Sequence, residues 1–330
     1  MLRSMPLPTA IASNRLFVVG SFVEAHCWFV TRAGSADESR HAMAYVREHG
    51  GKGLAVALGA RRLGAAVDLL IAAGEDAAGD ALLALLQREA LSSAHTHRLG
   101  PHSGQGCGMV GPHGETTVTV FAGANALLGV RELALADRAL AQAAVVYAQL
   151  ETSVALAVQA FQRARALGAL TVLNASPWPA TPARQDAAEW GALQAAAQVL
   201  VLNRNEAAGA LAAIPILGAL DALTSAALRA FWHTWSAAQW LVITLGAQGC
   251  VAYGADGAVW RLPGHAVTER QPIGAGDAFS AGLCAGLAER RPMPQALAWA
   301  NACGALAASR DGVLHSLPYR DEAHALVAAG

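Results

Sequence analysis

Short apolar runs alternate with longer amphipathic stretches along most of this chain. The run 15–21 is β-branched, brief and ended by glycine, which predicts a buried strand. A glycine turn and a helix are expected over 50–64, then a strand over 65–74 and a helix over 76–91. Because strands alternate with helices of about ten to fifteen residues, right-handed βαβ units and a mainly parallel sheet are predicted. Further helices are predicted over 131–143, 153–167, 186–197 and 221–238, each followed by a strand, at 143–150, 169–174, 198–203 and 239–246.

Two segments, 22–49 and 92–121, break this rhythm with polar or mixed sequence. The second contains the Gly-, Pro- and His-rich stretch 100–115 and the alternating stretch 115–123, a composition typical of hairpins. We interpret both segments as exposed antiparallel strands that form a small lid outside the main sheet. Since no repeat or clear linker is present, a single domain over 1–330 with this excursion is favoured over two independent domains.

Composition narrows the classes of function. Of 330 residues, 54% are apolar and 14% charged, so a substantial core is available. Every apolar run is interrupted before the roughly 18–20 residues that span a bilayer, and no signal-like apolar segment is seen near the N-terminus. The net charge of -1, without a basic stripe, argues against nucleic acid as a partner. Five widely spaced cysteines without a C-x-x-C pair are expected of free thiols in a cytoplasmic protein.

The stretch QPIGAGDAFSAG (271–282) places Asp277 behind a glycine turn at the start of an apolar helical run. Such a turn exposes backbone N–H groups at the positive end of the helix dipole, which suits a phosphate or a developing negative charge. A carboxylate there can accept a proton from a hydroxyl group. The alternative is a glycine turn that the aspartate merely caps.

Other polar residues follow predicted buried strands, at the sheet edge where ligands bind in open α/β folds. Asn203 and Glu206 could hold hydrated Mg²⁺, or could form a capping box with no ligand. Thr244 and Gly246 would let a nucleotide phosphate approach the backbone, or would form an ordinary turn. Glu151 could accept hydroxyl hydrogen bonds, or could begin a solvated helix.

Several familiar site motifs are not supported. GGKG (50–53) lacks the spacing and the Ser or Thr of a P-loop, and no G-x-G-x-x-G follows the first strand. G-x-S-x-G is also absent, which argues against a serine hydrolase.

Taken in order, the motifs resemble the ribokinase, or PfkB, family of carbohydrate kinases over about residues 15–325. This resemblance implies a three-layer α/β/α fold with a mainly parallel sheet and a small β lid. It also implies an ATP-dependent kinase that acts on a hydroxymethyl group. The stretches that carry it are VVGS, GGKGLAVALGARRLGA, GEDAAGDAL, AGAN, QLE, LNASP, NRNE, TLGAQG, GAGDAF and ANACGALAASRDGVLHSLP.

The resemblance also assigns roles. Asp277 would be the base, Gly274, Ala275 and Gly276 the anion hole, and Asn203 and Glu206 the organisers of Mg²⁺ and phosphates, in part through water. Thr244, Gly246 and Gly249 would line the nucleotide site, with Asn301 near the adenine. Gly51, Lys52 and Glu151 would lie on the substrate side, under the lid.

This chain departs from the family pattern at residues that would bind the acceptor. Val23, Ala25 and Ala55 stand where ribokinases carry Asn, Asp and Asn that hold sugar hydroxyls. Unpaired buried hydroxyls cost about 1–3 kcal/mol each, so ribose is disfavoured. Glu24, or its neighbours His26 and Trp28, could instead contact an acceptor with fewer hydroxyls or with a ring; otherwise these side chains pack the lid.

Gln271 stands where many members carry an aspartate that helps to bind an activating monovalent cation, which puts activation by K⁺ in doubt. Two alternatives to a sugar kinase remain open: a nucleoside or hydroxymethyl-pyrimidine kinase, and a catalytically weak relative that binds ligand and nucleotide. Edge pairing through 115–123 would allow a homodimer through the lid.

Overall fold

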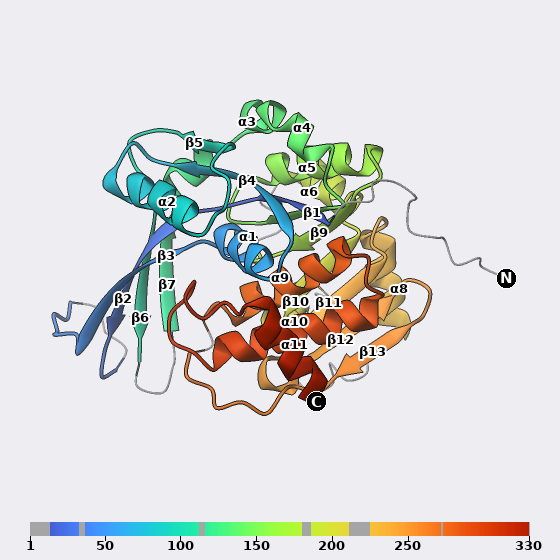
Figure 1. Ribbon diagram of the computed structural model, residues 1–330. Helices are drawn as coiled ribbons and strands as arrows, with labels where there is room; N and C mark the ends of the chain where they lie inside the picture. Colours follow the sequence, from blue (N-terminus) through green and yellow to red (C-terminus); the bar gives the residue numbers. More distant parts are fainter. Residues whose placement is uncertain are drawn as a thin grey trace.

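A large sheet forms the centre of the molecule (Figure 1). The computed structural model describes residues 14–32, 37–111, 116–179, 186–210, 225–271 and 273–329. Within them, the strand order is β13-β12-β11-β10-β9-β8-β1-β4-β5, with parallel pairing except at β12 and β13. These strands are β1 (Arg15–Val19), β4 (Ala66–Ala73), β5 (Thr96–Arg98), β8 (Val145–Gln149), β9 (Leu170–Asn174), β10 (Val199–Asn203), β11 (Trp240–Thr244), β12 (Cys250–Gly254) and β13 (Val259–Leu262).

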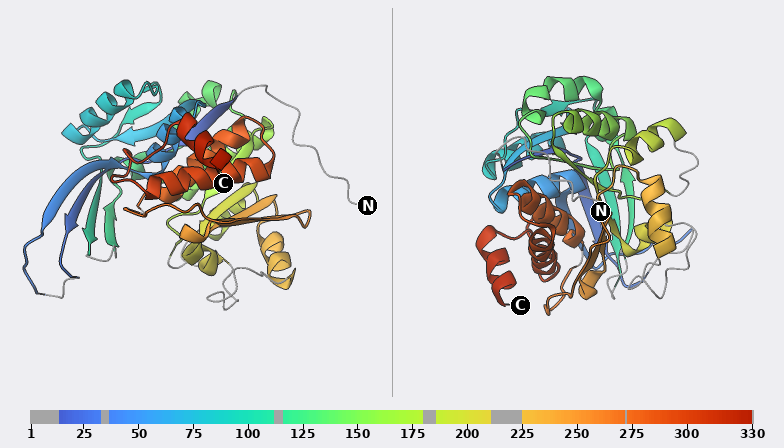
Figure 2. Two further views of the ribbon diagram at one scale, coloured as in Figure 1. Left: turned by 60° about the horizontal axis from the view of Figure 1, so that its bottom comes forward. Right: turned by 90° about the vertical axis from the view of Figure 1, so that its right-hand side faces the viewer.

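Helices cover both faces of this sheet, so the predicted three-layer architecture is confirmed (Figure 2). Strand β1 shows why: Leu16 and Val18 belong to one core and Phe17 and Val19 to the other, and all four are fully buried. The first core contains α1 (Lys52–Arg62), α2 (Ala77–Arg88), α9 (Ala275–Ala288), α10 (Met293–Ala308) and α11 (Arg320–Ala329). The second contains α3 (Val130–Leu135), α4 (Asp137–Leu140), α5 (Val154–Ala166), α6 (Ala187–Gln194), α7 (Arg204–Ala210) and α8 (Ser225–Thr234).

A second, small sheet extends from one end of the molecule (Figures 1 and 2). Its order is β3-β2-β6-β7, and we call it the small sheet below. The expectation of purely antiparallel strands was wrong for β2 and β6, which pair in parallel because they come from separate excursions of the chain. Within 92–121, β5 instead extends the main sheet beside β4. The strands are β2 (Val23–Phe29), β3 (Ala44–Gly50), β6 (Gly104–Val110) and β7 (Thr116–Phe121).

Other differences from the predicted elements are local. The helix expected over 131–143 is two short helices, since Ala136 between them has φ −101 and ψ 7. Helix α8 is shorter than the predicted 221–238, of which 221–224 lie outside the described residues. Strands β12 and β13 were not predicted. No helix in the described part of the chain is both long and apolar enough for a membrane span.

The strand order reverses at β1. The chain runs from β1 outward to β4, then returns to β8 on the other side and continues outward to β11. In open α/β sheets a ligand cleft forms outside the carboxyl ends of the strands near such a reversal. The residues that follow β1, β8, β9, β10 and β11 are therefore the first place to look for a site.

Candidate active site

The glycine turn before α9 forms one wall of a cavity of 570 Å³. Gly274 caps the helix with φ +87, a left-handed conformation that favours glycine. The first helical hydrogen bond runs from the N–H of Ala278 to Gly274 O, so the N–H groups of the first turn have no partner within the helix. A Cβ at Gly276 would meet no atom within 4 Å. The turn thus presents unhindered backbone to the cavity, as an anion site requires.

Asp277 lies in the first turn of α9, half-buried and lining the same cavity. Burial raises the pKa of its carboxyl group to about 6. The positive charge of Lys52 opposes this rise in pKa, whereas the negative charges of Glu151 and Glu206 add to it. In turn, the Asp277 carboxylate is the main cause of the raised pKa of Lys52. The charges of these two groups therefore influence each other, and both residues line the cavity.

Glu151 follows β8 and fixes the start of α1. Its Oε2 accepts hydrogen bonds from Ser21 Oγ at 2.5 Å and from the N–H of Lys52 at 3.0 Å. Gly51 has φ +110, and a Cβ there would lie 2.3 Å from Ser21 O, so only glycine fits. Glu151 does not line the cavity, and the sequence did not single out Ser21. Glu151 and Ser21 thereby hold Lys52, which does line the cavity.

Asn203 and Glu206 line the cavity and also form the capping arrangement considered as the alternative. Asn203 Oδ1 accepts from the N–H groups of Asn205 and Glu206, each at 2.9 Å, while Glu206 Oε2 accepts from Asn203 N–H at 2.8 Å. The reciprocal pair holds both side chains at the mouth of α7. Asn174, the last residue of β9, and Ser176, two residues later, line the cavity too and were not predicted as site residues.

One part of the cavity is lined by the turn after β11 and by residues of α9 and α10, and it combines turn backbone with apolar surface. Gly246 has φ +62, and a Cβ there would meet no atom within 4 Å; at Gly249 it would lie 2.1 Å from Leu262 O. Thr244 ends β11, with Oγ1 3.5 Å from Leu202 O. Asn301 is buried and donates to Pro263 O at 2.7 Å. The small or apolar residues Phe279, Gly304, Ala305 and Ala308 complete this part of the lining.

Glu24 lies elsewhere. It lines a second cavity, together with residues of β3 and α2, where its carboxylate is 3.7 Å from Arg47 Nε and 3.5 Å from His26 Nε2. Successive residues of a strand point to opposite faces, so Val23 and Ala25 lie on the other face of β2. The structure therefore separates Glu24 from the residues around Asp277.

Comparison with known proteins agrees with this geometry. The family model described as "pfkB family carbohydrate kinase" matches residues 13–320. The chain belongs to this family. A ribokinase of Mus musculus is 28% identical over 309 residues, which cover 92% of each chain. The chain is therefore an ATP-dependent phosphotransferase of the sugar-kinase class, with an alcohol group as acceptor.

Solved structures establish the pfkB-family fold independently. A ribokinase of Giardia lamblia superposes with a TM-score of 0.82 at 20% identity, covering 96% of this chain and 99% of that one. An Arabidopsis thaliana ribokinase complexed with ribose and ATP superposes with a TM-score of 0.80 at 19% identity, covering 95% and 98%. The predicted ribokinase-like fold is thus confirmed.

Proposed function

We propose that this pfkB-family member transfers the γ-phosphoryl group of ATP to a hydroxymethyl group of a small sugar-like acceptor. Asp277 is the general base, and the turn Gly274, Ala275 and Gly276 is the anion hole. The observation that carries this proposal is the position of Asp277, whose carboxyl has a pKa of about 6, in the first turn of α9 beside unhindered backbone N–H groups. A base with a pKa near the operating pH is suited to proton transfer.

The reaction forms one bond and breaks one. The acceptor oxygen attacks the γ-phosphorus, the bond from that phosphorus to the β,γ-bridging oxygen breaks, and ADP leaves. The acceptor proton passes to the Asp277 carboxylate. The N–H groups of the turn stabilise negative charge on the transferred group, while Lys52 offsets the charge that gathers near Asp277.

We assign nucleotide binding to the part of the cavity that is lined by the turn after β11 and by α9 and α10. Thr244, Gly246 and Gly249 lie along the phosphates, where bare backbone permits close approach. The buried Asn301 lies near the adenine, which the apolar surface of α9 and α10 receives.

Mg²⁺, when bound, would neutralise phosphate charge. Among the described residues, no group of three acidic, His or Cys side chains could hold a metal alone. Mg²⁺ is commonly bound through one or two carboxylates, waters and substrate phosphates. Glu206 fits this pattern, since its Oε2 accepts from Asn203 N–H and, among the described residues, no hydrogen bond engages its Oε1, which could bind a water. Asn203 keeps that carboxylate in place.

We infer a sugar-like acceptor and disfavour ribose. Val23, Ala25 and the fully buried Ala55 offer no hydrogen bonds to sugar hydroxyls. A nucleoside or hydroxymethyl-pyrimidine acceptor stays an alternative, but the rings of Trp28 and Tyr45, 5.3 Å apart, do not support it, because Trp28 lies on the same face of β2 as Glu24. The lost polar groups favour a weak, ligand-binding relative. Gly51, Lys52 and Glu151 remain on the acceptor side.

We assign the small sheet, with the ranges 22–49 and 92–121, to a lid of a single domain. Closure over the acceptor would exclude water and limit ATP hydrolysis. Its strands expose Val118, Val120 and Phe121, each more than half exposed, which supports pairing of two chains through the lid. Light scattering measures this directly, and a monomer mass at micromolar concentration would contradict it.

The deciding experiment is Mg²⁺- and ATP-dependent ADP release with a panel of sugars, sugar phosphates, nucleosides and hydroxymethyl-pyrimidines. Asp277→Asn is the matched variant, because it keeps the shape and removes the base. Turnover with one acceptor that this variant abolishes supports the proposal and names the acceptor class. Equal turnover by both proteins contradicts the role of Asp277, and ADP release with planar acceptors alone establishes the nucleoside-type alternative.

A further inference from the structure

Arg204 is the only arginine among the described residues that line the cavity around Asp277. It follows Asn203, the last residue of β10, and it is the first residue of α7. The residue is exposed to solvent. Because a guanidinium group stays protonated at any physiological pH, Arg204 brings a permanent positive charge to the wall of this cavity.

The Arg204 side chain connects two segments of the cavity wall. Its Nη2 donates a hydrogen bond to Oε1 of Gln248, the last residue of the short 3-10 helix η4 (Gly246–Gln248) that follows β11. Ala247 and Gly249, on either side of Gln248, line the cavity, whereas Gln248 itself does not. The side chain thus reaches from the wall after β10 to the turn after β11, along which we place the nucleotide phosphates.

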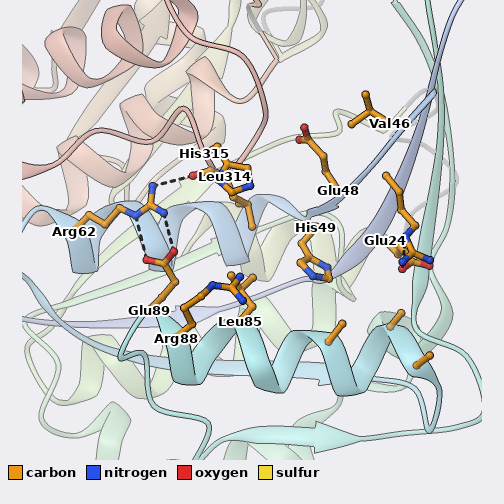
Figure 3. Close-up of a pocket in the computed structure, with 14 residues that line it drawn as sticks. Glu24, Val46, Glu48, His49, Arg62, Leu85, Arg88, Glu89, Leu314 and His315 are labelled. Carbon is orange, nitrogen blue, oxygen red and sulfur yellow. Dashed lines mark hydrogen bonds and ion pairs between the residues drawn. The ribbon is translucent and has the colours of Figure 1, made fainter. Parts of the chain in front are cut away.

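No carboxylate compensates the charge of Arg204. Gln248 is neutral, and Arg204 forms no ion pair within the part of the chain that the structure describes. By contrast, Arg62 in the cavity that Glu24 lines is paired with Glu89 at 2.9 Å (Figure 3). A guanidinium group has five N–H donors, so one hydrogen bond to Gln248 leaves donors of Arg204 for a ligand.

The other charged residues of the lining make this cation important for an anionic ligand. Glu206, Glu269 and Asp277 are acidic, and Lys52 is the other basic residue. Lys52 is buried, and its charge is coupled mainly to that of Asp277. Nucleotide phosphates add negative charge to this wall, and like charges a few ångströms apart repel each other. Arg204 is therefore the described cation of the lining that is available to offset the phosphates.

We propose that Arg204 binds the phosphates of the nucleotide and that Gln248 positions its guanidinium group. The inference rests on the proposed function, because it uses the nucleotide site assigned there. A planar guanidinium group can donate two parallel hydrogen bonds to one phosphate group. Because the hydrogen bond to Gln248 already restrains the side chain, less conformational freedom is lost when the nucleotide binds.

The test measures nucleotide binding by calorimetry with the whole chain and Mg²⁺, and it needs no knowledge of the acceptor. The probes are ADP, a non-hydrolysable ATP analogue and adenosine. Arg204→Ala is expected to raise the dissociation constants of ADP and of the analogue at least tenfold, which corresponds to about 1.4 kcal/mol. The dissociation constant of adenosine should not change, because adenosine carries no phosphate.

Three further variants separate a phosphate contact from a general effect. Arg131→Ala is the control, because Arg131 is an exposed arginine on α3 that does not line the cavity, and it should change none of the three constants. Arg204→Lys keeps the charge and should recover part of the affinity for ADP. Gln248→Ala should weaken ADP binding about two- to fivefold, and should have no further effect when combined with Arg204→Ala, since Gln248 acts through Arg204.

The outcomes distinguish this inference from the proposed function. Equal ADP affinity of Arg204→Ala and Arg131→Ala would overturn the role of Arg204 and leave the nucleotide site in place. An equal loss of affinity for adenosine and ADP would show that the substitution distorts the cavity, which also overturns a phosphate contact. If the unchanged chain binds neither ADP nor the ATP analogue, the nucleotide site of the proposed function is wrong, and the inference is wrong with it.

Discussion

Glu48 of the small sheet accepts a 2.8 Å hydrogen bond from the backbone N–H of Val313. Val313 in turn lies against the glycine turn before α9, since a Cβ at Gly274 would be 3.3 Å from Val313 O. One side chain thus connects the small sheet to the backbone that supports the proposed anion hole. Glu48 is a positioning residue in this arrangement, because it acts through Val313.

Replacing Glu48 should weaken catalysis without weakening ATP binding. We expect Glu48→Ala to lower kcat about tenfold, because loss of a hydrogen bond to a charged group costs about 1.5–3 kcal/mol and frees the loop beside Gly274. KM for ATP should stay near its original value. Glu48→Gln keeps an acceptor oxygen and should recover most of kcat. A purely structural role would instead lower the melting temperature and leave kcat per folded molecule unchanged.

The pH dependence of kcat/KM should follow the ionisation of Asp277. Only the carboxylate can accept the acceptor proton, and the pKa of this group is raised to about 6. We therefore expect kcat/KM to rise with pH through about 6 and to level off above 7, with a loss of about 10²–10⁴-fold in Asp277→Asn. A rate that is independent of pH between 5 and 8 would contradict this assignment of the base.

The same carboxylate should reduce stability. Its pKa in the folded chain, about 6, exceeds the ordinary value of 3.8, so the folded state binds more protons and stability falls as pH rises between these values. The full shift corresponds to about 3 kcal/mol, which exposure to water at a half-buried group reduces to about 1–2 kcal/mol. Asp277→Asn should therefore unfold at a higher denaturant concentration at pH 8.

This difference in stability should disappear toward pH 4, where the carboxyl group is protonated in the folded chain. Chemical unfolding of both proteins at pH 4, 6 and 8 measures the trend. Equal midpoints at pH 8 would show that Asp277 is not under electrostatic strain.

Gln271 should make the chain indifferent to K⁺. Its Oε1 accepts a 2.7 Å hydrogen bond from the N–H of Gly312 and carries no charge to attract a cation. We expect the same turnover in K⁺, Na⁺ and tetramethylammonium salts at equal ionic strength. Gln271→Asp restores a carboxylate and should introduce activation by K⁺. Activation of the unchanged chain by K⁺, absent with tetramethylammonium, would refute the prediction.

Hydrophobic patterning predicted the main sheet well because most of its strands are buried on both faces. β1, β8, β9 and β10 each read as a short apolar run, and each is nearly fully buried. Hydrophobic patterning did not predict the strands whose pairing depends on residues far away in the sequence. β13 is mostly exposed, and β5 is only three residues long, so neither carries a distinctive local signal.

The sequence predicted those cavity residues that lie within recognisable motifs. Asp277, its glycine turn and the pair Asn203 and Glu206 converge on one cavity, as expected of strand ends at one sheet edge. Ser21 was missed, because its role depends on Glu151, 130 residues away. The direction of Glu24 could not be read either, since it depends on which face of β2 meets α2.

The cavity around Asp277 draws all but one of its lining residues from the chain after residue 173, whereas the small sheet lies entirely before residue 122. Under the proposed function, the phosphate donor and the lid over the acceptor therefore come from separate stretches of the chain, and Lys52 is the one residue before residue 122 that lines the cavity around Asp277. If that assignment holds, recombination that exchanges the first stretch between relatives changes which acceptor is phosphorylated and leaves the nucleotide site intact.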